Sequence, residues 1–99
     1  MIALIATLQI KDGSTREFEH IFARLAGSVR SNEPENVVYR LCRTRGDENT
    51  YKVLEIYRDE AALEEHGKSE HFRAAGPDLG RSSMAGRTSN ISKLSVSDQ

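Results

Sequence analysis

The chain is poor in the residues that brace small folds covalently or fill large cores. Its 99 residues include no Trp and one Cys, and only 37% are hydrophobic. A single Cys cannot form an internal disulfide, and this usage is typical of a reducing compartment. The chain length fits one domain, residues 1–99, but the apolar content is low for a domain of this size. We therefore expect a domain that gains stability by burying surface against a second copy.

An excess of charge of one sign is also absent. The chain has 14 basic and 15 acidic residues, a net charge of −1, and no basic run, so nucleic-acid or anionic-membrane binding has no electrostatic basis. The apolar start of the chain is too short to span a membrane and lacks the basic residues of a signal peptide. We expect a cytoplasmic protein with no nucleic-acid or membrane partner.

The motifs of common cofactor and metal sites are missing. No glycine-rich loop of the phosphate-binding type follows a predicted strand, and the chain is too short for a separate flavin or nicotinamide domain. With one Cys, no zinc-finger pattern exists. His66 and His71 are five residues apart across Gly67, which breaks the i, i+4 geometry that places two ligands on one helical face. We expect neither a cofactor nor a metal.

What the sequence does contain is clear periodicity. Apolar residues at every second position predict a strand over residues 2–10. Ser14 and Glu17 have the spacing of a capping box. The i, i+3, i+4, i+7 spacing over residues 18–29 predicts a helix, which we expect to stop before Pro34.

Two further strands are predicted over residues 37–43 and 51–57, joined by a polar hairpin-type loop. In the first, alternation places Val37, Tyr39 and Leu41 on one face.

In the second half of the chain, capping residues predict shorter helices. Asp59 is a favourable N-cap for a helix that we expect Gly67 to end, and Ser69 can cap the next helix. Gly76-Pro77 should interrupt that helix, so residues 76–90 are interpreted as a weak helix or a mobile loop.

A last strand is predicted over residues 91–96. The order strand, helix, strand, strand, broken helix, strand is that of the split βαβ, or ferredoxin-like, α+β fold with helices on one face of the sheet.

Chemistry is concentrated in residues 51–72. Glu55 lies on a strand, and His66 shares a helical face with apolar residues. His66 can be a base poised near neutral pH or a helix-terminal imidazole that binds carbonyl groups. Glu55 can hold that ring in one tautomer or pair with Arg40 or Lys52. His71, in a helical first turn where a cation is disfavoured, should be neutral.

The segment EIYRDEAALEEHGKSEHF, residues 55–72, resembles the signature of the antibiotic biosynthesis monooxygenase family. The family pattern is a Glu, an aromatic residue, an acidic residue, an Ala-Leu pair, a His and a His-Phe pair. Tyr39, which follows Glu33-Pro34, resembles the family's Tyr on the second strand. The resemblance covers about residues 2–96. It implies a dimeric α+β barrel, in which two ferredoxin-like sheets pack face to face.

The resemblance also implies chemistry. The family includes quinol and anthrone monooxygenases that need no flavin or metal, so a small quinol, phenolic or polycyclic aromatic substrate and O₂ are expected. His66 would be the base and Glu55 its partner. The residues expected to contact the substrate are Tyr39, Phe22, Leu63, His71 and Phe72.

The same family includes an isomerase that processes a signalling sugar phosphate. A non-oxidative isomerase of a small phosphorylated metabolite, or a ligand-binding module, is therefore the alternative. Arg73, Arg81 and Arg87, near the expected lid, could bind a phosphate group.

Overall fold

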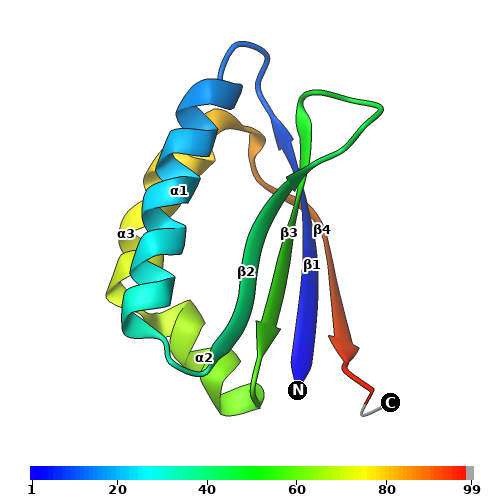
Figure 1. The fold of residues 1–99 in the computed structure, drawn as a ribbon. Coiled ribbons are helices and arrows are strands. Elements are labelled where there is room, and N and C mark those ends of the chain that lie inside the picture. Colours follow the sequence, from blue (N-terminus) through cyan, green and yellow to red (C-terminus); the bar gives the residue numbers. More distant parts are fainter. Residues whose placement is uncertain (98–99) are drawn as a thin grey trace.

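Within the described part of the chain, four strands and three helices form two layers. The computed structural model describes residues 1–97, without the side chains of residues 83–90. In chain order the elements are β1 (Ile2–Ile10), α1 (Thr15–Asn32), β2 (Asn36–Arg43), β3 (Thr50–Tyr57), α2 (Glu60–Lys68), α3 (Glu70–Ser82) and β4 (Ser83–Ser95). The sheet is antiparallel in the order β2-β3-β1-β4, and the helices lie on one of its faces (Figure 1). This is the expected ferredoxin-like α+β fold.

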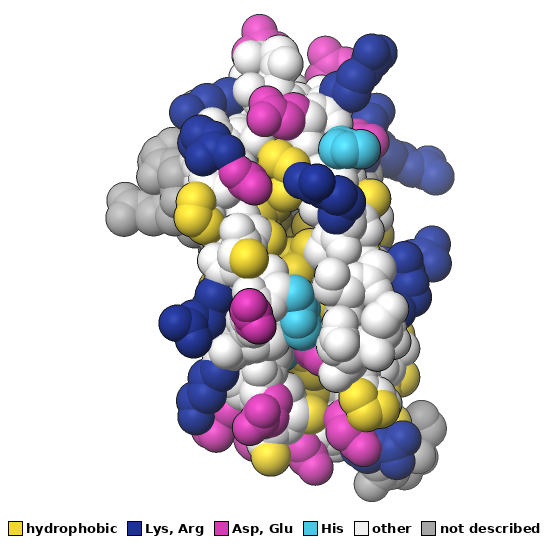
Figure 2. All heavy atoms as spheres, turned by 90° about the vertical axis from the view of Figure 1, so that its left-hand side faces the viewer, with side chains coloured by type: hydrophobic (Ala, Val, Ile, Leu, Met, Phe, Trp, Pro, Cys, Tyr) yellow, Lys and Arg dark blue, Asp and Glu magenta, His cyan; other side chains and the backbone are white. Residues whose placement is uncertain are grey.

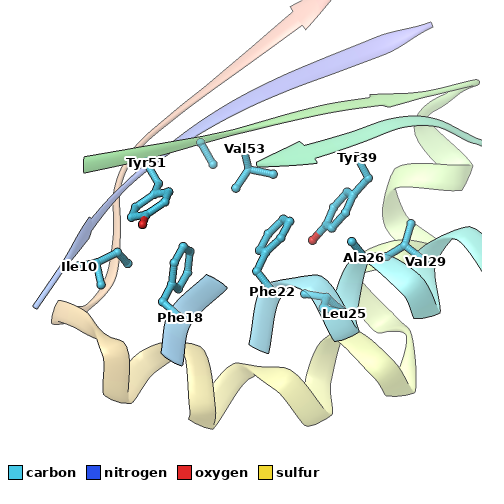
Figure 3. Close-up of a cluster of buried hydrophobic side chains, with 10 residues drawn as sticks. Ile10, Phe18, Phe22, Leu25, Ala26, Val29, Tyr39, Tyr51 and Val53 are labelled. Atoms are coloured by element: carbon cyan, nitrogen blue, oxygen red, sulfur yellow. The ribbon is translucent and has the colours of Figure 1, made fainter. Parts of the chain in front are cut away.

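The core lies between α1 and the sheet. Phe18, Phe22, Leu25 and Val29 repeat along the buried stripe of α1, as the periodicity predicts. Figure 3 shows their side chains pointing toward rings from β2 and β3. The ring of Phe18 packs at a tilt on that of Tyr51, with centroids 5.0 Å apart. Without Trp, aromatic rings on facing elements fill most of this layer.

The helical termini agree only in part with the expected caps. Ser14 is the N-cap of α1, but its side chain makes no capping hydrogen bond, so the predicted capping box is wrong. Asp59 does cap α2, where its carboxylate accepts from the backbone N–H of Ala62 at 2.9 Å. Within residues 1–97, no helix is both long and apolar enough to cross a membrane.

The junction between α2 and α3 falls slightly later than predicted. α2 runs through Gly67 to Lys68 and ends at Ser69, whose backbone is extended with φ −64° and ψ 148°. Gly67 therefore does not end the helix. The Ser69 hydroxyl accepts from the backbone N–H of Phe72 at 3.3 Å, so the predicted cap of the next helix is confirmed. Because the connection at Ser69 is short, α2 and α3 both contribute residues to the same cavity.

Residues 76–82 are helical, which agrees with the helical interpretation of the segment 76–90, whereas residues 83–90 belong to a strand, which was not predicted. α3 continues through Pro77 to Ser82, and β4 begins at Ser83 and pairs with β1, with register shifts near Leu8. Proline removes one backbone donor, yet Ala75 and Leu79, on either side of it, pack against the core. Packing of this face therefore outweighs the lost hydrogen bond. The last strand is longer than the predicted 91–96 because ladder pairing with β1 extends it.

The opposite face of the sheet bears no helix in the described part of the chain (Figure 1), and part of it is apolar. Register places Val38, Ile56, Ala3 and Leu94 in one row across the four strands. Leu54, in the next row, is 37% exposed, and Leu94 is 49% exposed. Val37, predicted on the same face as Tyr39, is exposed whereas Tyr39 is buried, because a register shift between Asn36 and Val38 disturbs the alternation there.

Candidate active site

A cavity of about 350 Å³ opens between the helices and the sheet. Its wall is mainly apolar, and Figure 2 shows hydrophobic side chains along the groove on the helical face. The cavity lining includes six of the residues expected at the site: Phe22, Tyr39, Glu55, Leu63, His66 and Phe72. They come from α1, β2, β3, α2 and α3, so the fold brings together residues that are far apart in the sequence. A volume of this size suits a small ligand.

His66 lies near the end of α2 and is only 4% exposed. Aromatic rings surround it: the ring centroid of Phe72 is 4.7 Å away, that of Tyr39 5.3 Å and that of Tyr57 5.4 Å. Phe72 itself is 36% exposed, so it covers the imidazole from the solvent side. The imidazole is therefore enclosed by side chains at the end of its helix.

The partner of His66 is Glu33, which the sequence analysis did not assign to the site. Nδ1 of His66 lies 3.0 and 2.9 Å from the two carboxylate oxygens of Glu33. An ionised carboxylate only accepts hydrogen bonds, so Nδ1 carries the proton and donates. The other nitrogen, Nε2, is then unprotonated in the neutral ring. His66 is thereby set in the tautomer that a general base needs.

Glu33 is positioned by the end of α1, where it is the C-cap residue. An anion is disfavoured at a helical C-terminus because the carbonyl ends of the peptide dipoles point there. A Glu in this position, directly before Pro34, therefore conflicts with the local preference of the chain. Such conflicts tend to mark functional residues, and this was the signal available in the sequence.

Glu55 faces the cavity from β3 because side chains alternate along the strand and Val53 and Tyr57 are buried on the same side. Its Oε1 accepts from the Tyr57 hydroxyl at 2.7 Å and lies 4.0 Å from Nε2 of His66. Glu55 forms no ion pair with Arg40 or Lys52; Lys52 donates to Thr7 instead. The 4.0 Å gap is too wide for a direct hydrogen bond and leaves Nε2 available to a bound molecule.

Burial shapes the ionisation of this region. It raises the pKa of Glu55 above its usual value, although the Tyr57 hydroxyl and His66 oppose the shift. Burial, reinforced by the charge of Glu55, also raises the pKa of Tyr39 and of Tyr57, so both phenols stay protonated. Tyr57 thus acts as a donor to Glu55. The ring of Tyr39 stacks on Phe22 at 5.3 Å with an interplanar angle of 6°.

The raised pKa of Glu55 makes a pH-dependent prediction about stability. A carboxyl group whose pKa is higher in the folded than in the unfolded chain binds its proton more tightly when folded. The contribution of the Glu55 carboxyl to the stability of the fold is therefore fully present below its pKa in the unfolded chain. This contribution is lost as pH rises through its pKa in the folded protein. Glu55→Gln should raise the melting temperature more at about pH 8 than at about pH 4. Glu60→Gln, at an exposed residue paired with Lys93, is the matched control; an equal gain from both variants would contradict the prediction.

His71 does not line the cavity, contrary to its expected role as a substrate contact. Its Nε2 instead makes a short hydrogen bond with the same Glu33 carboxylate that binds His66. The physical reason is the Ser69 corner, which begins α3 so that the first turn lies over the end of α1. The cavity wall also includes Gly76, Leu79 and Gly80 from α3, in the segment interpreted from the sequence as a weak helix or a mobile loop.

His66 and His71 lie on different helices, α2 and α3, so the i, i+4 spacing within one helix does not govern their separation. Contrary to the expectation from the sequence, the break at Gly67 therefore does not keep the two imidazoles apart. One donor atom from each of Glu33, His66 and His71 lies within 4.8 Å of the others.

The four-stranded antiparallel sheet, its three helices and the cavity between them define the chain as a ferredoxin-like α+β protein with a site under the helices. Residues 1–77 match the family model of antibiotic biosynthesis monooxygenases. The chain therefore belongs to the antibiotic biosynthesis monooxygenase family.

Individual relatives agree with this assignment. The chain is 36% identical over 73 residues to YcnE of Bacillus subtilis (strain 168), provisionally named a monooxygenase, and the match covers 74% of this chain and 76% of YcnE. A Caulobacter crescentus CB15 structure, provisionally named an antibiotic biosynthesis monooxygenase, is 40% identical with a TM-score of 0.92, covering 98% of this chain and 90% of that one. SnoaB of Streptomyces nogalater, a cofactor-independent oxygenase solved as a mutant, shares the fold at 20% identity with a TM-score of 0.82; the match covers 99% of this chain and 94% of SnoaB.

Proposed function

We propose that the protein is a cofactor-independent monooxygenase that oxidises a small quinol, phenolic or polycyclic aromatic substrate with O₂. One observation carries the proposal. Nδ1 of His66 is hydrogen-bonded to Glu33, which leaves Nε2 available, and His66 lines a mainly apolar cavity. A positioned base of this kind can deprotonate an electron-rich aromatic substrate. The name of SnoaB, which has the same fold, supports chemistry without a cofactor on this scaffold.

The proposed reaction needs no reactant other than the substrate and O₂, because the substrate supplies the electrons. Nε2 of His66 takes a proton from an acidic C–H or O–H, and the resulting anion gives one electron to O₂. The substrate radical and superoxide combine through a new C–O bond, and the proton returns to the peroxide. Loss of water across the O–O bond then leaves a carbonyl group, with one oxygen atom in the product and one in water. The protein contributes the base and an apolar site for the anion.

Oxygen consumption tests the proposal most directly. The purified protein, after treatment with EDTA and without flavin absorbance, should consume O₂ when given an anthrone or a quinol. One O₂ should be consumed for each substrate molecule converted. Stoichiometric conversion of a substrate with no O₂ uptake would contradict a monooxygenase.

A non-oxidative isomerase is the second candidate, and the arrangement of Glu55 and His66 favours it. The pKa of Glu55 is raised, and the group lies 4.0 Å from Nε2 of His66, so an acid and a base could move a proton between two substrate atoms. A phosphorylated substrate lacks support, because Arg73 and Arg81 do not line the cavity. Arg81 pairs with Asp78, and the side chain of Arg87 lies outside the described residues.

We further propose a homodimer formed through the open face of the sheet. Apolar side chains on that face include the partly exposed Leu54 and Leu94, from neighbouring rows, and a domain this small gains much from covering such a face. Sedimentation equilibrium should give about twice the 11.1 kDa chain mass. Leu54→Lys should shift the protein toward monomer, whereas Ala61→Lys on exposed α2 should not. A wild-type monomer at low micromolar concentration would rule out the dimeric barrel.

A further inference from the structure

The Glu33 carboxylate binds two imidazoles at once, on the side of His66 that faces away from Glu55. Its partners are Nδ1 of His66, at 2.9 Å, and Nε2 of His71. All three side chains are largely enclosed, with 11% of Glu33, 5% of His66 and 17% of His71 exposed. They come from the end of α1, from α2 and from the first turn of α3. The proposed oxidation uses only the opposite nitrogen of His66, so His71 has no part in it.

The electrostatics of this cluster leave room for a cation. Among the described residues, Glu33 forms ion pairs only with these two imidazoles and with no Lys or Arg. A buried carboxylate is costly unless a positive group compensates it. Its two partners are imidazoles, whose ring nitrogens are also metal-ligand atoms. The cluster therefore places two nitrogen donors beside one largely enclosed carboxylate.

We propose that Glu33, Nδ1 of His66 and Nε2 of His71 bind a divalent transition-metal ion of the zinc type. Two imidazoles and one carboxylate form a donor set typical of Zn²⁺ and its neighbours, whereas Mg²⁺ and Ca²⁺ prefer oxygen ligands. In a tetrahedral zinc site, donor atoms lie roughly 3.3 Å apart. The His66–Glu33 distances of 2.9 and 3.0 Å are close to this.

The other two sides of the triangle require adjustment: the short contact between Nε2 of His71 and Glu33 must lengthen, and the two nitrogens must come closer together. The three donor atoms lie within 4.8 Å of one another, so the two nitrogens need to approach by at most about 1.5 Å to reach tetrahedral spacing. Rotation of the partly exposed His71 side chain can supply this movement. The same exposure gives an ion access from the surface.

Binding at this site would change the chemistry of His66, an inference that rests on the proposed function. A neutral imidazole that ligates a metal through Nδ1 carries its proton on Nε2. That nitrogen could then donate but could not accept a proton from the substrate. The metal-bound protein would be inactive as an oxygenase, and the site would therefore be inhibitory.

Zinc titration of the EDTA-treated protein tests the site without any substrate. A background variant carrying His20→Ala and Cys42→Ser removes the other His and the only Cys. Calorimetry should then give one Zn²⁺ per chain, and adding His71→Ala should weaken binding by more than the roughly 10–100-fold that loss of an outer-sphere partner costs. Glu70→Gln, at the exposed neighbour of His71, should leave binding unchanged.

A second measurement guards against a variant that fails to fold. In ¹⁵N spectra of the folded background protein, Zn²⁺ should shift the Nδ1 resonance of His66 and move its proton to Nε2. Absence of binding at millimolar Zn²⁺, or equal affinity with and without His71, would overturn the site and leave only a hydrogen-bonded cluster. Zinc binding with this signature but no inhibition of O₂ uptake would overturn the inhibitory role alone. A failed oxygenase assay would not affect the binding result.

Discussion

Replacing His66 with glutamine should lower turnover by ~10²–10⁴-fold, the usual cost of losing a positioned base. The amide can still donate to Glu33, so the buried carboxylate keeps a partner, but it cannot accept a substrate proton at neutral pH. The measurement is O₂ uptake on an anthrone or quinol, with circular dichroism to verify the fold. His66→Ala should lose as much activity and also some stability, because it removes a buried ring that contacts Tyr39, Tyr57 and Phe72.

The matched control is His20→Ala. His20 is an exposed residue of α1, so its loss should change neither turnover nor melting temperature. If a folded His66→Gln protein turns over normally on a substrate of the wild type, His66 is a structural residue and the proposed mechanism fails. The prediction concerns the chemical step, so substrate affinity should change much less than the maximal rate.

The sheet and the long helix were predictable because their signals are local. Alternation over residues 2–10 places Leu4, Ala6 and Leu8 on one face whatever the partner strand is, and all three line the cavity. The stripe of α1 likewise depends only on spacing. α3 was not predictable in the same way, because Gly76 and Pro77 argue against a helix and only tertiary packing of Ala75 and Leu79 reverses that preference.

In the candidate site, too, the features with local sequence signals were predictable and those that depend on tertiary packing were not. His66 and Glu55 could be assigned from the signature around them, but their relation could not. Two carboxylates compete for the imidazole, and the nearer in sequence, Glu55, is the farther in space at 4.0 Å. Glu33 reaches Nδ1 from 33 residues away, because the end of α1 and the end of α2 converge under the Ser69 corner. A pairing of this range follows from how helices pack, and no local pattern specifies it.

Glu33→Gln provides the sharpest test of how His66 is oriented. An amide placed at Nδ1 can donate through its NH₂ group, which would stabilise the tautomer with the proton on Nε2. In serine proteases, the comparable change from Asp to Asn costs about 10⁴ in rate for this reason. We expect Glu33→Gln to lower turnover by roughly 10²–10⁴-fold while the protein stays folded.

A purely structural role for Glu33 would give a different result. In ¹⁵N spectra, the neutral His66 ring should carry its proton on Nδ1 in the wild type and on Nε2 in Glu33→Gln. Glu33→Asp keeps the charge on a shorter side chain, so it should retain the wild-type tautomer and recover part of the rate. If Glu33→Gln leaves the tautomer unchanged, or loses activity only in proportion to unfolding, Glu33 stabilises the fold and does not position the base. Because His71 remains available to donate to the residue at position 33 in all three proteins, differences among them report on His66.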